Sequence, residues 1–174
     1  MTWARPGRLG PDARLAFLRR PRRPSWCYGT PGLVRAQQLA GLALADHDRQ
    51  RAAEHALAGC LTDPGQLAQL TDPALCHGWA GVLLTAWHAA ADAGTPDITS
   101  QLPMLIDAVL QHAPGCGHRG LIEGSAGIAL TLHTITTPAG TGWESCLLIS
   151  KPAGNSPGEE RRCPRRSASR GTIG

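Results

Sequence analysis

The sequence predicts an all-α fold built from repeated helical hairpins. Alanine- and leucine-rich stretches of helical length recur along the centre of the chain, a glycine motif opens each of them, and no convincing run has the alternating pattern of a β-strand. The 174 residues, 42% of them hydrophobic, are enough for one domain with a substantial core.

A Gly-x-x-Gly motif organises the predicted inner helices. It occupies residues 29–32, 78–81 and 124–127. This spacing, close to fifty residues, is typical of stacked supersecondary units. Each motif opens an apolar stretch, and we expect inner helices over 32–45, 79–91 and 125–136. The glycines would let a loop pass close to a neighbouring backbone before each helix begins.

More polar outer helices are expected between the inner ones. The first covers residues 48–60, with its packed stripe predicted at Ala52, His55, Ala56 and Gly59. The second covers residues 97–112, with an apolar face predicted at Leu102, Leu105, Ile106, Val109 and Leu110. The short apolar run 147–149 is expected to be a packed end segment. About three hairpins are therefore predicted.

The two ends of the chain are basic and its centre is acidic. Residues 1–24 hold seven arginines, whereas residues 25–150 hold four arginines and ten acidic residues. We interpret 1–22 and 151–174 as disordered basic segments around a domain at 23–150. The arginine runs lack interleaved aromatic residues and helical spacing, so a nucleic-acid partner is not predicted.

The sequence also shows neither an apolar run of membrane-spanning length nor a signal peptide. We therefore expect a cytoplasmic protein with no transmembrane segment. Its six cysteines are expected to be thiols or metal ligands rather than disulfides.

The loops that precede the first two inner helices carry the residues suited to metal binding. Cys27 comes shortly before the first glycine motif, and Cys76 and His77 directly precede the second. If the repeats stack side by side, equivalent loops meet at one end of the helices. Two thiolates and one imidazole are a typical three-ligand zinc set with one open position. The alternative is that these side chains are buried or incidental, as free cysteines often are.

Three segments resemble signatures of the lanthionine synthetase C-like cyclases. They are Ser25-Trp-Cys-Tyr-Gly-Thr-Pro-Gly32, Leu75-Cys-His-Gly-Trp-Ala-Gly81 and Gly120-Leu-Ile-Glu-Gly-Ser-Ala-Gly127, and the run from Gly142 to Leu148 resembles the family's closing segment. The resemblance implies an α/α toroid with Zn²⁺ bound by Cys27, Cys76 and His77. It covers about residues 23–150.

The resemblance also implies a reaction and a substrate. The family acts on precursor peptides in which Ser or Thr has been dehydrated, and it joins a peptide cysteine to the resulting alkene as a thioether. Only the thiolate attacks, and a free thiol is mostly protonated at neutral pH, so binding to zinc would activate it. The implied partners are the dehydrated precursor peptide and possible partner proteins, namely a dehydratase or a separate N-terminal half.

Two further positions match residues that line the family's active site. Tyr28 is expected to donate a hydrogen bond and Arg23 to stabilise an enolate oxygen; the alternatives are that Tyr28 only packs and that Arg23 belongs to the basic tail. Glu123 is expected to pack or to cap a helix. Cys116 and His118 have no counterpart among the family's ligands, and we expect them to be bystanders.

The chain departs from the family in one respect that bears on function. The family's acid/base His and Asp lie before the Trp-Cys-Tyr-Gly motif, and residues 1–22 contain no His and only Asp12. We therefore expect a C-terminal portion of the fold, with incomplete catalysis on its own. Three interpretations stay open: a zinc-dependent cyclase portion, a non-catalytic peptide-binding scaffold, and an unrelated helical-repeat domain.

Overall fold

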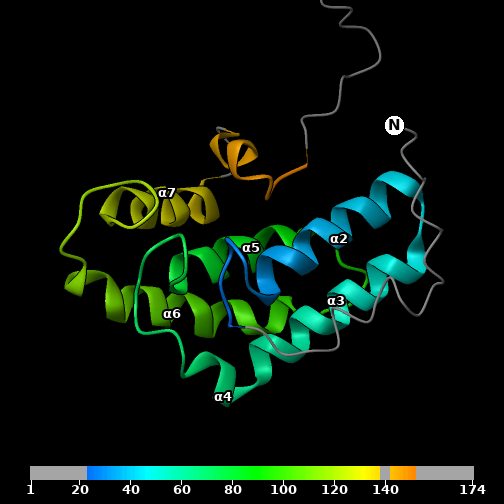
Figure 1. Cartoon of the computed structure of the whole chain (residues 1–174), viewed down its shortest axis with the longest axis horizontal. Coiled ribbons are helices and arrows are strands. Elements are labelled where there is room, and N and C mark those ends of the chain that lie inside the picture. Colours follow the sequence, from blue (N-terminus) through cyan, green and yellow to red (C-terminus); the bar gives the residue numbers. More distant parts are fainter. Residues whose placement is uncertain (1–22, 138–141, 152–174) are drawn as a thin grey trace, which may run out of the picture.

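The computed structural model describes residues 23–137 and 142–151, and every regular element within them is helical (Figure 1). This confirms the all-α prediction. The segments that we expect to be disordered, 1–22 and 151–174, lie outside the described residues except for Lys151, which is ordered by an ion pair with Asp92. The closure of the helices into a toroid stays a prediction.

The three predicted inner helices are present with nearly the predicted bounds. They are α2 (Thr30–Leu44), α5 (Trp79–Asp92) and α7 (Ser125–Thr136). The residue before each helix is the first glycine of a motif, Gly29, Gly78 or Gly124, and all three have extended backbone conformations. The equivalence of the three segments is therefore visible in their local geometry as well as in their sequence.

Outer helices follow the first two inner ones and complete two hairpins. The outer elements are α3 (His47–Thr62), α4 (Pro64–Leu67), η2 (Thr99–Gln101), α6 (Leu102–His112) and η3 (Ala113–Gly115). Helix α3 packs on α2, α6 packs on α5, and α5 contacts both α2 and α7 (Figure 1). The last described element is η4 (Trp143–Leu147).

The set of buried side chains predicted for α3 was wrong: the buried side of the helix is shifted by about one residue. His55 and Gly59 are exposed, and the buried side chains are those of Ala53, Glu54, Leu57, Cys60 and Leu61. The physical reason is that the two leucines bury far more apolar surface than alanine or glycine, so they decide which side of the helix faces the core. On α6, Leu102, Leu105 and Val109 are buried as predicted, whereas Leu110 is exposed.

Helix α5 is the centre of the packing. Every residue from Trp79 to Ala86 is buried, because α2, α6 and α7 cover it. The main core cluster also contains Leu57 and Leu61 of α3 and Leu105 and Val109 of α6. A helix that is buried on most of its sides needs an apolar sequence throughout, and α5 has one.

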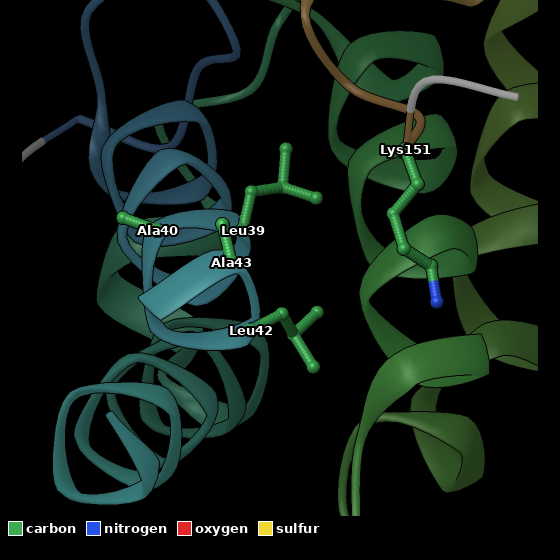
Figure 2. Close-up of a pocket in the computed structure, with 5 residues that line it drawn as sticks. All are labelled: Leu39, Ala40, Leu42, Ala43 and Lys151. Carbon is green, nitrogen blue, oxygen red and sulfur yellow. The ribbon is translucent and has the colours of Figure 1, made fainter. Parts of the chain in front are cut away.

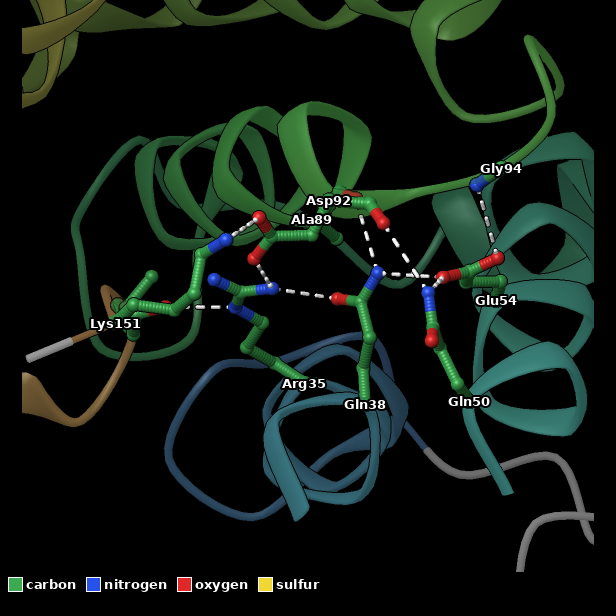
Figure 3. Close-up of polar contacts among 9 residues, drawn as sticks. Arg35, Gln38, Gln50, Glu54, Ala89, Asp92, Gly94 and Lys151 are labelled. Carbon is green, nitrogen blue, oxygen red and sulfur yellow. Dashed lines mark hydrogen bonds and ion pairs between the residues drawn. The ribbon is translucent and has the colours of Figure 1, made fainter. Parts of the chain in front are cut away.

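A buried polar network joins the middle of α2, the middle of α3 and the C-terminal end of α5 (Figure 3). The guanidinium of Arg35, only 2% exposed, donates to Gln38 Oε1 at 2.6 Å and to Asp92 Oδ2 at 2.9 Å. Gln38 in turn donates to Glu54 Oε1 at 2.9 Å and to the carbonyl of Ala89 at 3.0 Å. Burial lowers the pKa of Arg35, and the carboxylate of Asp92 opposes that shift. Because each charge has a partner, the network fixes the relative positions of three helices.

Across residues 23–137 and 142–151, none of the helices is both long enough and apolar enough to span a membrane.

We predict opposite effects for two glycine-to-alanine substitutions. A Cβ at Gly81 would lie 1.9 Å from the carbonyl oxygen of Leu75, so Gly81→Ala must displace the loop and should lower the free energy of unfolding by about 1–3 kcal/mol. A Cβ at Gly59, inside α3, meets nothing within 4 Å, so Gly59→Ala should raise stability by about 0.5–1 kcal/mol. Urea denaturation followed by circular dichroism measures both. Equal effects would contradict the close-approach role of Gly81.

Candidate metal and thiol site

The three loops that precede the inner helices have the same winding. In each, the first helical N–H donates to the carbonyl seven residues earlier: Thr30 to Arg23, Trp79 to Asp72, and Ser125 to His118. Arg23, Asp72 and His118 are therefore equivalent positions in three repeats. The sequence alone does not reveal that these three positions are equivalent, because a different residue type occupies each of them.

The three loops lie side by side, as expected from the repeat. The N–H of Cys27 donates to the carbonyl of Cys76 at 3.3 Å, and the N–H of Cys76 donates to the carbonyl of Ile122 at 2.9 Å. These two bonds form a short ladder across the repeats, which we call the loop ladder. It brings the backbones of the two predicted cysteine ligands next to each other.

In the second and third repeats, the second glycine of the motif lies against the loop of the preceding repeat. A Cβ at Gly81 would lie 3.3 Å from the Cβ of Trp26 in the preceding repeat, and a Cβ at Gly127 would lie 3.1 Å from that of Leu75. Side chains at these positions would therefore push neighbouring loops apart. The glycines place each loop directly against the start of the next inner helix.

The two thiols are neighbours with different environments. Cys27 is exposed and Cys76 is half-buried. Burial raises the pKa of the Cys76 thiol to about 11, and a side-chain hydrogen bond and charge interaction with Cys27 act in the same direction. The negative charges of Glu123 and Asp72 raise it further. Without a cation nearby, this environment favours the protonated thiol.

The third predicted ligand, His77, is half-buried beside a carboxylate. Its Nε2 lies 3.7 Å from Oδ2 of Asp72, and the other carboxylate oxygen of Asp72 accepts a 2.6 Å hydrogen bond from the N–H of Ala74. In the part of the chain that the structure describes, no group of three His, Cys, Asp or Glu side chains is gathered closely enough to hold a metal ion. The structure thus brings Cys27 and Cys76 together but does not add His77 to them.

The two predicted catalytic side chains are open to solvent. Tyr28 is 57% exposed and Arg23 is exposed at the start of the described chain. Glu123 was expected to pack or cap, but it is exposed and its charge acts on the thiol of Cys76. Its location could have been found from the sequence, since it immediately follows Ile122, the repeat equivalent of the two cysteines.

Within residues 23–137 and 142–151, no other cysteine or histidine is gathered with these two thiols into a metal-binding group. Cys116 donates a 3.5 Å hydrogen bond to the carbonyl of His118. Cys60 is buried in α3. An apolar pocket of about 520 Å³ lies elsewhere, between Lys151 and α2, and none of the predicted site residues lines it (Figure 2).

The fold and the site define a class: a stack of helical hairpins whose glycine-opened loops bring cysteines together. The family model for "Lanthionine synthetase C-like protein" matches residues 11–148, so the chain belongs to the lanthionine synthetase C-like family. The match begins at residue 11, before Ser25, the first residue of the Trp-Cys-Tyr-Gly signature.

A curated relative gives a much weaker comparison. The chain is 29% identical over 72 residues to an atrochrysone carboxyl ACP thioesterase of Aspergillus fumigatus. That segment is 40% of this chain and 17% of the fungal protein. The chain thus spans only about a sixth of that relative's length, and this similarity does not change the family assignment.

We predict that the thiols differ strongly in reactivity towards an alkylating reagent. Burial raises the pKa of Cys60 to about 12, and the charge of Asp63 adds to the shift, so almost no reactive thiolate forms there at neutral pH. Cys27 is exposed and should be alkylated by iodoacetamide in the native, metal-free protein. Peptide mapping by mass spectrometry should show Cys60 modified only after denaturation. Modification of native Cys60 at a rate like that of Cys27 would contradict the described packing of α3.

Proposed function

We propose that this chain is a zinc-binding protein of lanthionine cyclase type, acting on a dehydrated precursor peptide. The observation that supports this most directly is the adjacency of Cys27 and Cys76, which the loop ladder holds together within the segment that matches the family. Two neighbouring thiols are the donor set that favours Zn²⁺ over Mg²⁺ or Ca²⁺.

The surroundings of the two thiols fit a metal ion in two further ways. The high pKa of Cys76 reflects an environment in which a negative charge lacks compensation, and a divalent cation would supply it. His77 has a carboxylate close to Nε2, the arrangement that commonly orients a metal-binding imidazole through its other nitrogen. We propose His77 as the third ligand, reached by rotation of its side chain.

The proposed reaction is the addition of a peptide thiol to dehydroalanine or dehydrobutyrine. Zinc bound here would lower the pKa of a coordinated substrate thiol. The sulfur then forms a bond to the alkene β-carbon, and the electron pair of the double bond moves to give an enolate. Tyr28 would donate a hydrogen bond to this enolate and Arg23 would stabilise its oxygen, after which the α-carbon takes up a proton and the thioether is complete.

A second candidate function is a zinc-binding scaffold that holds the peptide but does not close rings. The exposure of Tyr28 and Arg23 favours it, because groups that stabilise a transition state work best in a site that excludes water. A dehydratase or a separate N-terminal half would then be the partner that completes catalysis. We further propose a cytoplasmic location, where thiols stay reduced.

We predict about one zinc ion per chain, because Cys27, Cys76 and His77 together form one zinc site with three protein ligands. Replacing Cys27, Cys76 or His77 by alanine should each lower the bound zinc strongly, because each removes one of the three ligands. Elemental analysis of the purified variants measures this. Cys116→Ala and His118→Ala are the matched controls and should keep their zinc. Unchanged zinc in Cys76→Ala would refute the assignment.

We predict that the 174-residue chain alone cyclises a dehydrated peptide slowly. General acid–base help is typically worth about 10²–10⁴-fold, and residues 1–22, which precede the Trp-Cys-Tyr-Gly motif, offer no His and only Asp12 for this role. Loss of free peptide thiol, followed by alkylation and mass spectrometry, measures the rate.

The controls for this experiment are Cys76→Ala and a separately expressed N-terminal half from a family member. Activity that appears only after the half is added supports a divided enzyme. Ring closure by the chain alone, far above the uncatalysed rate and abolished by Cys76→Ala, would show that no partner is needed.

A further inference from the structure

The last described segment of the chain, residues 144–151, is tied to the loop that carries Cys27 and to the buried polar network; we call it the C-terminal strap. Near the thiols, the carbonyl of Leu147 accepts a 3.2 Å hydrogen bond from Nε1 of Trp26. Further along, the carbonyl of Ile149 accepts a 2.6 Å bond from Nε of Arg35, and Nζ of Lys151 forms a 2.5 Å ion pair with Asp92 (Figure 3). The strap is therefore fixed at several points along its length.

The side chains of the strap pack against the residues that precede the two thiols. Leu147 and Ile149 form a separate core cluster with Leu75 and Leu84, and Trp26 packs against it. Trp26 is the neighbour of Cys27, and Leu75 is the neighbour of Cys76. One small cluster thus supports both halves of the thiol pair, although more than sixty residues of chain separate the strap from Cys76.

A buried carboxylate of the strap, that of Glu144, makes a further contact with α5. Glu144 is only 4% exposed, and its Oε1 lies 3.6 Å from Nε2 of His88. Leu148, between the two buried apolar residues, is 80% exposed. The alternation of inward Leu147, outward Leu148 and inward Ile149 shows that the segment is seated in one register and does not lie loosely on the surface.

We propose that the C-terminal strap positions the thiols of Cys27 and Cys76, so that Trp26, Leu147 and Ile149 are positioning residues of the site. This rests on the proposed function for its biological meaning, but the geometric claim concerns the thiols alone. Consecutive Cα atoms are a fixed distance apart, so a shift of Trp26 or Leu75 moves the adjacent cysteine. The strap thereby sets the separation of the two sulfur atoms.

The first test compares two buried isoleucines. Ile149→Ala removes strap packing, whereas Ile98→Ala removes an equally buried side chain from the main core, away from the cluster at the thiols. In the metal-free protein, the bridging of Cys27 and Cys76 by dibromobimane reports their separation, with peptide mapping to identify the linked residues. Ile149→Ala should slow bridging roughly tenfold, because intramolecular reactions are sensitive to small displacements, and Ile98→Ala should leave the rate near that of the wild type.

The second test removes one hydrogen bond and little volume, and it serves if Ile149→Ala does not fold. Trp26→Phe deletes the donor to Leu147 but keeps an aromatic ring in the cluster. The matched control is Trp143→Phe, which deletes a 2.9 Å bond to Thr134 of α7 instead. Trp26→Phe should slow bridging more than Trp143→Phe does.

A cobalt titration separates this inference from the proposed function. The absorption bands of Co²⁺ bound to thiolates report the ligand geometry, and Ile149→Ala should weaken Co²⁺ binding roughly tenfold relative to Ile98→Ala. Slower bridging in Ile149→Ala, with no Co²⁺ bound even by the wild type, supports the strap and refutes the metal proposal. Co²⁺ binding by the wild type, with equal bridging in all variants, refutes the strap and leaves the metal proposal standing.

Discussion

The close contact between successive loops is the constraint on which the rest of the structure depends. Two backbone hydrogen bonds, from Cys27 to Cys76 and from Cys76 to Ile122, connect three repeats at one end of the helices. Such bonds need backbones in contact, and the second glycine of the motif permits this because it has no Cβ to meet the preceding loop. The same glycines therefore determine the stacking of the hairpins and the adjacency of the two thiols. In this chain the site is a direct consequence of how the repeats pack.

Much of this arrangement could be predicted from the sequence, because it comes from a repeated pattern. The motif positions predicted the three inner helices almost to the residue, and the loop equivalence predicted that Cys27 and Cys76 lie together. The all-α class was confirmed for the same reason. The buried side of a single helix was less predictable. The predicted buried stripe of α3 was wrong because alanine and glycine were given the same weight as leucine. Glu54 is also buried there, among polar partners that a pattern of apolar residues does not show.

Long-range polar contacts were the other part that the sequence could not supply. Arg35 is a charged residue on an inner helix, and nothing local in the sequence indicates that it contacts Asp92 and the carbonyl of Ile149. The site has the same property. The exposure of Tyr28 and the effect of Glu123 on Cys76 depend on how three loops meet, so they follow from tertiary structure and not from the motif in which each residue lies.

The hairpin stack is held by two different kinds of interaction. The loop end depends on backbone hydrogen bonds and close contacts, which tolerate little displacement. The contact between the middle of α2 and the C-terminal end of α5 depends on the buried charges of Arg35 and Asp92, which require every partner to be present. The strap contacts both: Leu147 bonds to Trp26 beside a thiol, while Ile149 and Lys151 bond to the charged network. The strap therefore connects the buried charges to a residue beside the thiols by direct contacts, independently of the hydrogen bonds within the helices.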